Sequence, residues 1–205
     1  MKFPALLHRL YWRLRPTKNN GKNNVVEIKS KRHNFYIRID GNNNSINIGD
    51  GSRLKNTKIL TSGDNNHITA ESGSKFDGPC KIILEGNATL KIGCNSGIRG
   101  VTFVLKDANI SVGRNCMFSY DVLLRNNDSH KVLDCDGNIT NVAQDIVIND
   151  HVWLCERSSI LKGVNIGNDS IIAFGAVVTK DCPPNSIMAG NPARVVKRNI
   201  NWLNK

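Results

Sequence analysis

The residue of this chain best suited to chemistry is a histidine in a long polar segment. His130 lies within residues 125–145, a stretch rich in Asn and Asp that has no regular pattern. An imidazole can accept or release a proton near neutral pH, which is the task of a general base or acid. Asp128, Asp134 or a backbone carbonyl could orient its second ring nitrogen. A lone loop histidine is more often exposed and inert, so a catalytic role depends on what surrounds it.

The chain is strongly basic. Of its 205 residues, 28 are Lys or Arg and 17 are Asp or Glu, which gives a net charge of +11. Such a charge predicts an anionic partner. Nucleic acid is not expected, because no recognised binding motif accompanies the charge and aromatic residues make up only 6%. A phosphorylated cofactor, an acidic sugar polymer, a membrane surface or a merely solvated surface would each explain it.

The six cysteines show no chemical pattern. No two of them have CxxC or metal-ligand spacing, so we expect reduced structural thiols and no metal site. No apolar run is long enough to span a bilayer, and residues 1–16 lack the apolar core and cleavage site of a signal peptide. A cytoplasmic protein is therefore expected.

The elements that must position these residues are indicated by a period of six. Aliphatic residues recur at every sixth position through the second half of the chain, at Ile148, Leu154, Ile160, Ile166, Ile172 and Val178. The same period relates Ile48, Leu54 and Leu60, and it is looser in between. Neither a helix nor a flat strand produces this spacing. It fits a chain that turns after each short strand, which predicts a parallel β-helix rather than antiparallel strands.

The sequence divides into three parts. Residues 1–24 are predicted to form a short basic helix and a linker, which either lies on the inner face of a membrane or packs against the coil. Residues 25–180 form the β-helix, interrupted by the loop 125–145. The repeat ends at Pro183 and Pro184, which cannot donate hydrogen bonds to a neighbouring strand. Residues 181–205 are therefore expected to cap the coil as a strand or a short helix.

Several segments together resemble a known family. They are NDSHKVLD around His130, then HVW, VVTKD and AGNPARVVK. Their combination resembles the left-handed β-helix hexapeptide-repeat O-acetyltransferases, which include sugar, capsular-polysaccharide, maltose and galactoside acetyltransferases. The resemblance is carried by residues 112–198. It implies an all-β, left-handed parallel β-helix, acetyl-CoA as the acyl donor, and a homotrimer with active sites between neighbouring coils.

The resemblance also implies roles for single residues. His130 would deprotonate a sugar hydroxyl as it attacks the thioester, in a direct transfer without an enzyme nucleophile. Trp153 matches a family tryptophan beside the active site, where it faces the acceptor or the pantetheine arm of the donor. His151 is a rival base that ranks below His130. Coenzyme A would contact the backbone near Ala173 and Gly175 and the side chains of Thr179, Lys180, Arg194 and Lys197.

Two residues depart from the family pattern, and several functions stay open. Cys155 stands where the family usually has Gly, and Phe174 where it has a small residue. The expected acceptor is a hydroxyl of a capsular, exopolysaccharide or lipopolysaccharide sugar or its precursor, and the basic charge favours an acidic glycan. The alternatives are an N-acetyltransferase acting on an amino-sugar nucleotide and a non-catalytic β-helix scaffold or carbohydrate-binding protein.

Overall fold

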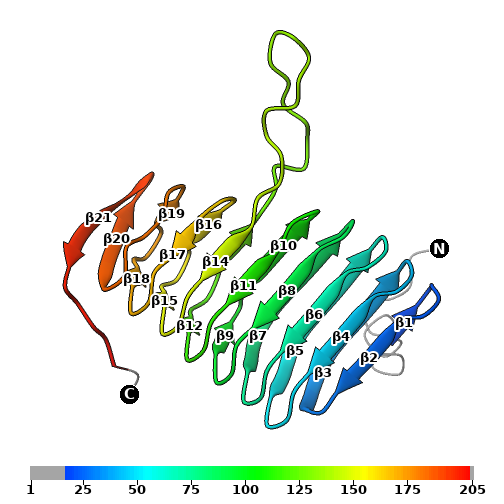
Figure 1. Cartoon of the computed structure of the whole chain (residues 1–205). Coiled ribbons are helices and arrows are strands. Elements are labelled where there is room, and N and C mark those ends of the chain that lie inside the picture. Colours follow the sequence, from blue (N-terminus) through cyan, green and yellow to red (C-terminus); the bar gives the residue numbers. More distant parts are fainter. Residues whose placement is uncertain (1–16, 204–205) are drawn as a thin grey trace, which may run out of the picture.

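The chain winds into a parallel β-solenoid, as the six-residue period predicts (Figure 1). The computed structural model describes residues 17–203, and within them every regular element is a strand. Residues 17–203 accordingly include no helix that could cross a membrane. The predicted N-terminal helix falls largely on residues 1–16, which lie outside the described residues.

Twenty-one strands make up the described chain. They are β1 (Thr17–Asn19), β2 (Val25–Ile28), β3 (Lys31–Asp40), β4 (Ser45–Ile48), β5 (Arg53–Ser62), β6 (His67–Ala70), β7 (Lys75–Glu85), β8 (Thr89–Ile92), β9 (Gly97–Arg99), β10 (Thr102–Lys106), β11 (Ile110–Val112), β12 (Met117–Phe118), β13 (Leu123–Arg125), β14 (Ile146–Ile148), β15 (Trp153–Leu154), β16 (Ser159–Leu161), β17 (Asn165–Ile166), β18 (Ile171–Ile172), β19 (Val177–Val178), β20 (Ser186–Gly190) and β21 (Ala193–Arg198). All pairs are parallel except β20 with β21.

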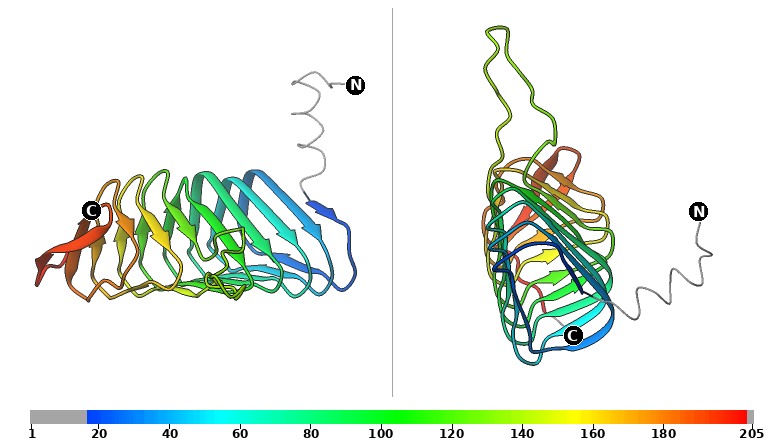
Figure 2. Two further views of the ribbon diagram at one scale, coloured as in Figure 1. Left: turned by 90° about the horizontal axis from the view of Figure 1, so that it is seen from above. Right: turned by 90° about the vertical axis from the view of Figure 1, so that its right-hand side faces the viewer.

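The coil has three faces, here named A, B and C, and the chain passes through them in the order B, A, C (Figures 1 and 2). Face B contains β2, β4, β6, β8, β11, β14 and β17. Face A contains the first parts of β3, β5 and β7, followed by β9, β12, β15, β18 and β20. Face C contains β1, the second parts of β3, β5 and β7, and then β10, β13, β16 and β19.

The inward side chains form one stacked core. The six aliphatic residues that define the period are all between 0% and 2% exposed. Between Asp150 and Asn168, partners on neighbouring coils are 18 positions apart, which is three repeats of six. Between Asn44 and Asn66 the separation is 22. The longer early coils explain why the period is loose there.

One early position corrects the sequence prediction. Leu60 was placed in register with Ile48 and Leu54, but it is only half-buried, and Ile59 is buried instead at 1% exposure. The shift arises at Asn56, which adopts a left-handed φ of 52° where β5 turns from face A to face C. Asparagine tolerates this conformation better than most residues do. From Leu54 to Ile59 the chain advances five residues instead of six, so this corner is one residue shorter than the repeat and the side chains after it are shifted by one position.

The two ends of the coil extend beyond the predicted limits of the repeat. At the start, β1 pairs with β3, so the first coil begins at Thr17 rather than at residue 25. At the other end, β20 pairs in parallel with β18 and extends face A. β21 then folds back antiparallel on β20, so the segment after the two prolines forms a hairpin.

Candidate functional site

The segment predicted as a functional loop leaves the coil between β13 and β14 and projects far from it (Figures 1 and 2). It departs from the corner between faces C and B, which is the corner opposite face A. Two buried side chains hold the point where the loop leaves the coil: Asn126 is 0% exposed and Asn127 is 7% exposed. The Asn126 side-chain oxygen accepts hydrogen bonds from Lys106 N at 2.9 Å and from Asn127 Nδ2 at 3.0 Å. The loop therefore starts from a rigid point.

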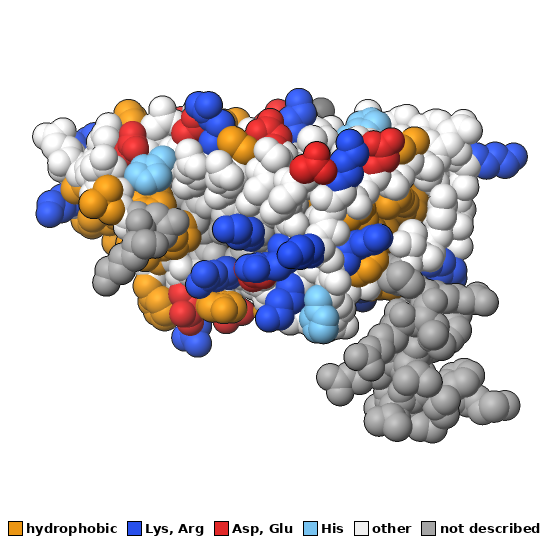
Figure 3. All heavy atoms as spheres, turned by 90° about the horizontal axis from the view of Figure 1, so that it is seen from below, with side chains coloured by type: hydrophobic (Ala, Val, Ile, Leu, Met, Phe, Trp, Pro, Cys, Tyr) orange, Lys and Arg blue, Asp and Glu red, His pale blue; other side chains and the backbone are white. Residues whose placement is uncertain are grey.

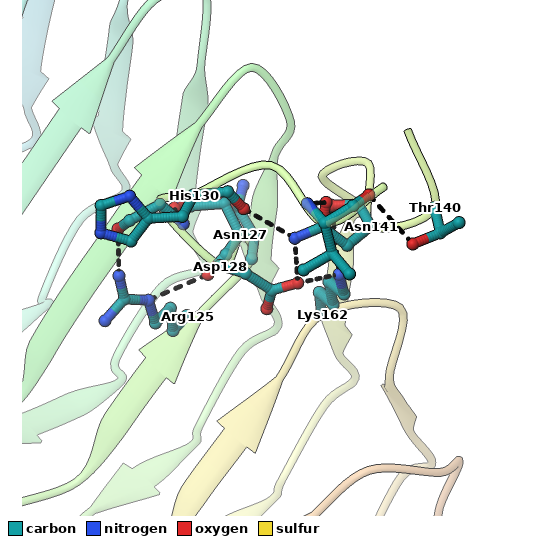
Figure 4. A network of polar contacts seen from close by, with 10 residues as sticks. Arg125, Asn127, Asp128, His130, Thr140, Asn141 and Lys162 are labelled. Atoms are coloured by element: carbon teal, nitrogen blue, oxygen red, sulfur yellow. Dashed lines mark hydrogen bonds and ion pairs between the residues drawn. The ribbon is translucent and has the colours of Figure 1, made fainter. Parts of the chain in front are cut away.

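A polar network holds the backbone of His130 (Figure 4). Asn141 Nδ2 donates to the carbonyl oxygen of His130 at 2.8 Å and to the Asp128 carboxylate at 3.0 Å. The amide of His130 donates to the carbonyl oxygen of Asp128 at 2.8 Å. Lys162, from the next coil, forms an ion pair with Asp128 and donates to the carbonyl oxygen of Asn141 at 3.2 Å. The two sides of the loop are thus tied to each other and to the coil.

The ion pair with Lys162 also determines the charge state of Asp128. The Lys162 ammonium group is the main cause that holds the pKa of Asp128 below its usual value of 3.8, and the Asn141 amide adds to the effect. The carboxylate is therefore ionised wherever an imidazole titrates. The anchor of the loop does not change its charge near neutral pH.

The imidazole ring of His130 is exposed and makes no hydrogen bond within residues 17–203. It points away from the Asp128 carboxylate, which reaches His130 only through Asn141, whose amide also bonds the His130 carbonyl oxygen (Figure 4). Asp134 does not orient the ring either. Its carboxylate accepts hydrogen bonds from the amides of Asp136 and Asn138, both at 2.9 Å, and so holds the turn of the loop.

Trp153 lies on face A, at the start of β15. Its indole Nε1 donates to Ser119 Oγ at 3.4 Å, and its ring centroid is 5.8 Å from that of Trp202. Trp202 in turn stacks on His151 with a centroid distance of 4.0 Å. The Nδ1 atom of His151 is 2.8 Å from the Asp169 carboxylate. The rival base is thus engaged in a packed cluster that supports Trp153.

The residues predicted to bind coenzyme A lie in separate places. Thr179 and Lys180 are exposed and follow β19 at the corner between faces C and B, the corner from which the loop departs. Ala173 and Gly175 lie between β18 and β19, at the corner between faces A and C. Arg194 and Lys197 lie on the last strand, β21, and both side chains are exposed.

These positions divide the predicted site into two halves. His130 and Asp128 lie in the loop at the corner between faces C and B, Thr179 and Lys180 lie on the same corner two coils further on, and Trp153, Ala173 and Gly175 lie on or beside face A. Because the loop corner is opposite face A, a single chain does not bring His130 and Trp153 together. Gly175 leaves its corner open, since it has a left-handed φ of 66° and an added Cβ would meet nothing within 4 Å.

The two residues that depart from the family pattern contribute no nucleophile or metal ligand. Burial raises the pKa of the Cys155 thiol to about 11, so the thiol is neutral at physiological pH. Phe174 is 62% exposed, and the Arg157 guanidinium lies 5.6 Å from its ring centroid. Residues 17–203 contain no group of three or more His, Cys, Asp or Glu side chains that could hold a metal ion.

Face C carries an aliphatic stripe on its outer side. Leu60, Ile83 and Val104 follow one another in register, and Arg125 and Leu161 continue the row. The aliphatic members are half-buried and have no covering element within the described chain. The projecting loop exposes further large apolar side chains, with exposed fractions of 46% to 59%, at Val132, Leu133, Ile139 and Val142. Both surfaces are suited to contact with another chain.

Sequence reasoning missed Lys162 and Asn141, the two residues that hold the loop. Lys162 reaches Asp128 across 34 positions, and Asn141 reaches His130 across 11. Aligning the repeats would have found Lys162, because Arg125 pairs with Leu161 and the next residues are then Asn126 and Lys162. No such register exists inside the loop, so Asn141 had no signal.

No protein-family model matches the chain. Two curated relatives are polysialic acid O-acetyltransferases. That of Neisseria meningitidis is 31% identical over 190 residues, which are 90% of this chain and 88% of the relative. That of Escherichia coli O1:K1 / APEC is 35% identical over 149 residues, which are 72% of this chain but only 43% of the relative.

Solved structures show the same fold. The polysialic acid-specific acetyltransferase NeuO has a TM-score of 0.85 at 34% identity, over 92% of this chain and 88% of that one. The polysialic acid O-acetyltransferase OatWY has a TM-score of 0.88 at 29% identity, over 92% of each chain. A hexapeptide-repeat acetyltransferase of Vibrio cholerae O1 biovar eltor, solved in complex with acetyl coenzyme A, has a TM-score of 0.50 at 26% identity, over 62% of this chain and 70% of that one.

Proposed function

The chain belongs to the left-handed β-helix, hexapeptide-repeat O-acetyltransferases, and we propose that it transfers an acetyl group from acetyl-CoA to a hydroxyl of an acidic, sialic acid-containing capsular polysaccharide. The observation that carries this proposal is the network that fixes the backbone of His130 and leaves its ring free to act. A loop histidine held in this way is a built feature and not an inert surface residue.

His130 is the general base of the proposed reaction. Its neutral imidazole takes the proton of the acceptor hydroxyl while the hydroxyl oxygen attacks the thioester carbonyl. The imidazolium then returns that proton to the departing thiolate, which leaves as the free thiol. The reaction exchanges a thioester and an alcohol for an ester and a thiol, and it needs no covalent enzyme intermediate. The neutral Cys155 thiol is consistent with this direct transfer.

The acyl donor is proposed to lie along the outer corners near the C-terminal coils. Backbone groups near Ala173 and Gly175 are accessible to an amide-rich pantetheine arm, since an added Cβ at Gly175 would meet nothing within 4 Å. Lys180, Arg194 and Lys197 are exposed cations suited to its phosphates. The Vibrio cholerae neighbour was solved with acetyl coenzyme A, which supports the same donor here.

The active site is proposed to form between two chains of a homotrimer. One chain places His130 at the loop corner and Trp153 on the opposite side, so a second copy must supply one of the two groups. The aliphatic stripe of face C and the apolar side chains of the projecting loop provide surfaces for such contacts. A closed trimer gives every loop a neighbour and leaves no stripe uncovered.

The test is acetyl transfer from acetyl-CoA to polysialic acid by the wild type and by two histidine variants. His130→Ala should lower kcat by about 10²- to 10⁴-fold, the usual contribution of a positioned base. The matched control is His67→Ala on face B, whose ring lies beside Ser45 and which should keep the wild-type rate. Mild alkali should remove the transferred acetyl group from the product as acetate, because it hydrolyses O-acetyl esters and leaves N-acetyl amides intact.

Each possible failure has a distinct meaning. Unchanged activity of His130→Ala would rule out this residue as the base. An alkali-stable product on an amino-sugar nucleotide would support the N-acetyltransferase instead. Binding of the polymer without any transfer would support the non-catalytic scaffold.

A further inference from the structure

Face A carries two columns of basic side chains on its outer side in the N-terminal coils. The register of the ladder places Lys31, Arg53 and Lys75 side by side on β3, β5 and β7. A second column, two residues further along each strand, consists of His33, Lys55, Asp77 and Arg99. Figure 3 looks onto this side of the molecule and shows Lys and Arg side chains gathered across its middle. These seven residues are here named the basic track.

The basic track is far from electrically neutral. Asp77 is its only carboxylate, and it forms a bidentate pair with Arg53, which is the main cause that lowers the pKa of Asp77. Lys31, Lys55, Lys75 and Arg99 have no carboxylate partner in ion-pair contact within residues 17–203. Four cations on one face repel each other, so they favour a polyanion that bridges them.

The track borders a groove with an aromatic wall. His33, Arg53, Lys55, Asp77, Arg99 and Tyr120 line an open groove of about 600 Å³. Tyr120 is 47% exposed, and its ring lies over the corner glycines Gly78 and Gly100. An added Cβ at Gly100 would come within 2.8 Å of that ring, and Gly100 also has a left-handed φ of 61°. Glycine at this corner thus leaves room for the aromatic ring of Tyr120 beside the cations.

The first column continues directly to Trp153. Lys75 pairs with Gly97, Gly97 with Met117, and Met117 with Trp153, all on the outer side of face A. Three strand spacings, roughly 14 Å, therefore separate Lys75 from Trp153. At Gly97 the path is open, since an added Cβ would meet nothing within 4 Å. Local packing does not require glycine there, whereas a ligand lying along the column would.

We propose that the basic track is a binding site for the polymer, which holds an acidic polysaccharide along face A and leads it over Gly97 to Trp153. This inference rests on the proposed function for the reaction at Trp153, but the track is a separate site that binds sugar units far from the reacting one. The regularly spaced carboxylates of such a polymer meet cations spaced by the ladder, and Tyr120 offers a flat surface to a sugar ring.

A polysaccharide fits this surface better than a nucleic acid does. Nucleic acid grooves usually combine cations with several aromatic side chains on which bases stack. Here, among residues 17–203, Tyr120 is the one Phe, Tyr or Trp that lines the groove. The column also ends at a residue of the acyl-transfer site, for which a sugar hydroxyl is the proposed acceptor.

The experiment measures binding and catalysis separately. The neutral variant is Lys55→Gln/Lys75→Gln/Arg99→Gln, which leaves the Arg53–Asp77 pair intact. The second variant is Gly97→Leu, which the fold accommodates and which obstructs the path. The control is Lys22→Gln/Lys91→Gln, two exposed lysines away from face A. Fluorescent polysialic acid and a DNA strand of equal charge are titrated onto the full chain, and KM and kcat are measured with the polymer and with a sialic acid dimer.

The neutral variant should bind polysialic acid about tenfold more weakly and raise its KM to the same extent, as expected for three lost exposed charge contacts. Its kcat, its KM for acetyl-CoA and its activity on the dimer should not change. Gly97→Leu should raise the KM for the polymer alone, and the control should match the wild type.

The inference and the proposed function fail in different ways. If the wild type and the neutral variant have the same affinity and KM for the polymer, the basic track does not bind it, even if the enzyme is active. Tighter binding of DNA than of polysialic acid would overturn the choice of ligand. Polymer binding that depends on the track, without acetyl transfer, would support the track and contradict the proposed function.

Discussion

At the scale of single residues, the candidate base is prepared through its backbone. Asn141 and Asp128 bind the carbonyl and the amide of His130, while the ring itself has no partner within the described chain. Such an arrangement fixes where the imidazole is presented and leaves both ring nitrogens for the reaction. Its precision depends on Lys162, which ties Asp128 to the next coil.

Loss of the ion pair between Lys162 and Asp128 should reduce turnover. We expect Asp128→Asn and Lys162→Met each to lower kcat by about ten- to a hundredfold, since small misplacements of a catalytic group are costly. The lowered pKa of Asp128 means that its stabilising ion pair is present above the usual carboxylate pKa and is lost only as the pH falls through the still lower folded value. Asp128 therefore keeps its charge, and the loop keeps its anchor, throughout the range near neutral pH.

The measurement is the pH profile of kcat/KM for each variant. Its acid limb should stay at the wild-type pH while the plateau falls. Asp136→Asn, which alters an exposed carboxylate in the same loop, is the control and should leave the plateau unchanged. A limb that moves in Asp128→Asn would mean that this carboxylate acts directly on the ring.

Cys155 should be chemically silent. Its pKa of about 11 reflects burial alone, so almost none of the thiol is ionised at pH 7.5. Treatment with iodoacetamide followed by peptide mass spectrometry should modify the exposed Cys135 first and spare Cys155. Cys155→Ala should keep the wild-type kcat. Rapid alkylation of Cys155 with parallel loss of activity would contradict direct transfer and point to a thiol intermediate.

At the scale of elements, the period of six correctly predicted the buried positions of the coils that repeat regularly. It located the buried residues of β14 to β19 because these coils are 18 residues long. It failed at Leu60, because the corner at Asn56 is one residue shorter than the repeat, and this shift of register leaves no mark in composition. The loop was visible as a break in the pattern. Its contacts were not, because Lys162 reaches the loop from another coil, and Asn141 lies within the loop, where no repeat predicts which residues meet.

Adjacent positions on one strand should differ sharply in their effect on stability. Ile148 is 1% exposed in the stacked core, whereas Val147 beside it faces outward on face B. Ile148→Ala should lower the free energy of unfolding by about 2–5 kcal/mol, the usual cost of a cavity at a buried aliphatic site. Val147→Ala should cost clearly less. Urea unfolding followed by circular dichroism compares the two, and equal losses would contradict the inward register of the repeat.

At the scale of the whole molecule, the residues of the proposed site lie on two separate parts of the chain. His130 projects from the corner between faces C and B, and Trp153 lies on face A, opposite that corner. The uncovered stripe through Val104 on face C lies between the two halves. Around a three-fold axis, the loop of each copy would meet face A of its neighbour, and the basic track of that neighbour would then lead the polymer to a site completed by another chain.

Mixing two inactive variants tests this arrangement. His130→Ala chains lack the base and keep Trp153, and Trp153→Ala chains lack the tryptophan and keep the base. If equal amounts are unfolded and refolded together, a site is intact only when an unaltered His130 meets an unaltered Trp153 from the next chain. Random assembly of a closed ring makes this true for about a quarter of the sites. We therefore expect about a quarter of the wild-type rate from a mixture of two proteins that are each nearly inactive.

The control adds Val104→Glu to both chains, because a charge in the stripe should prevent assembly and abolish the recovery. Trimers that assemble fully, by light scattering, yet recover no activity would place the whole site within one chain.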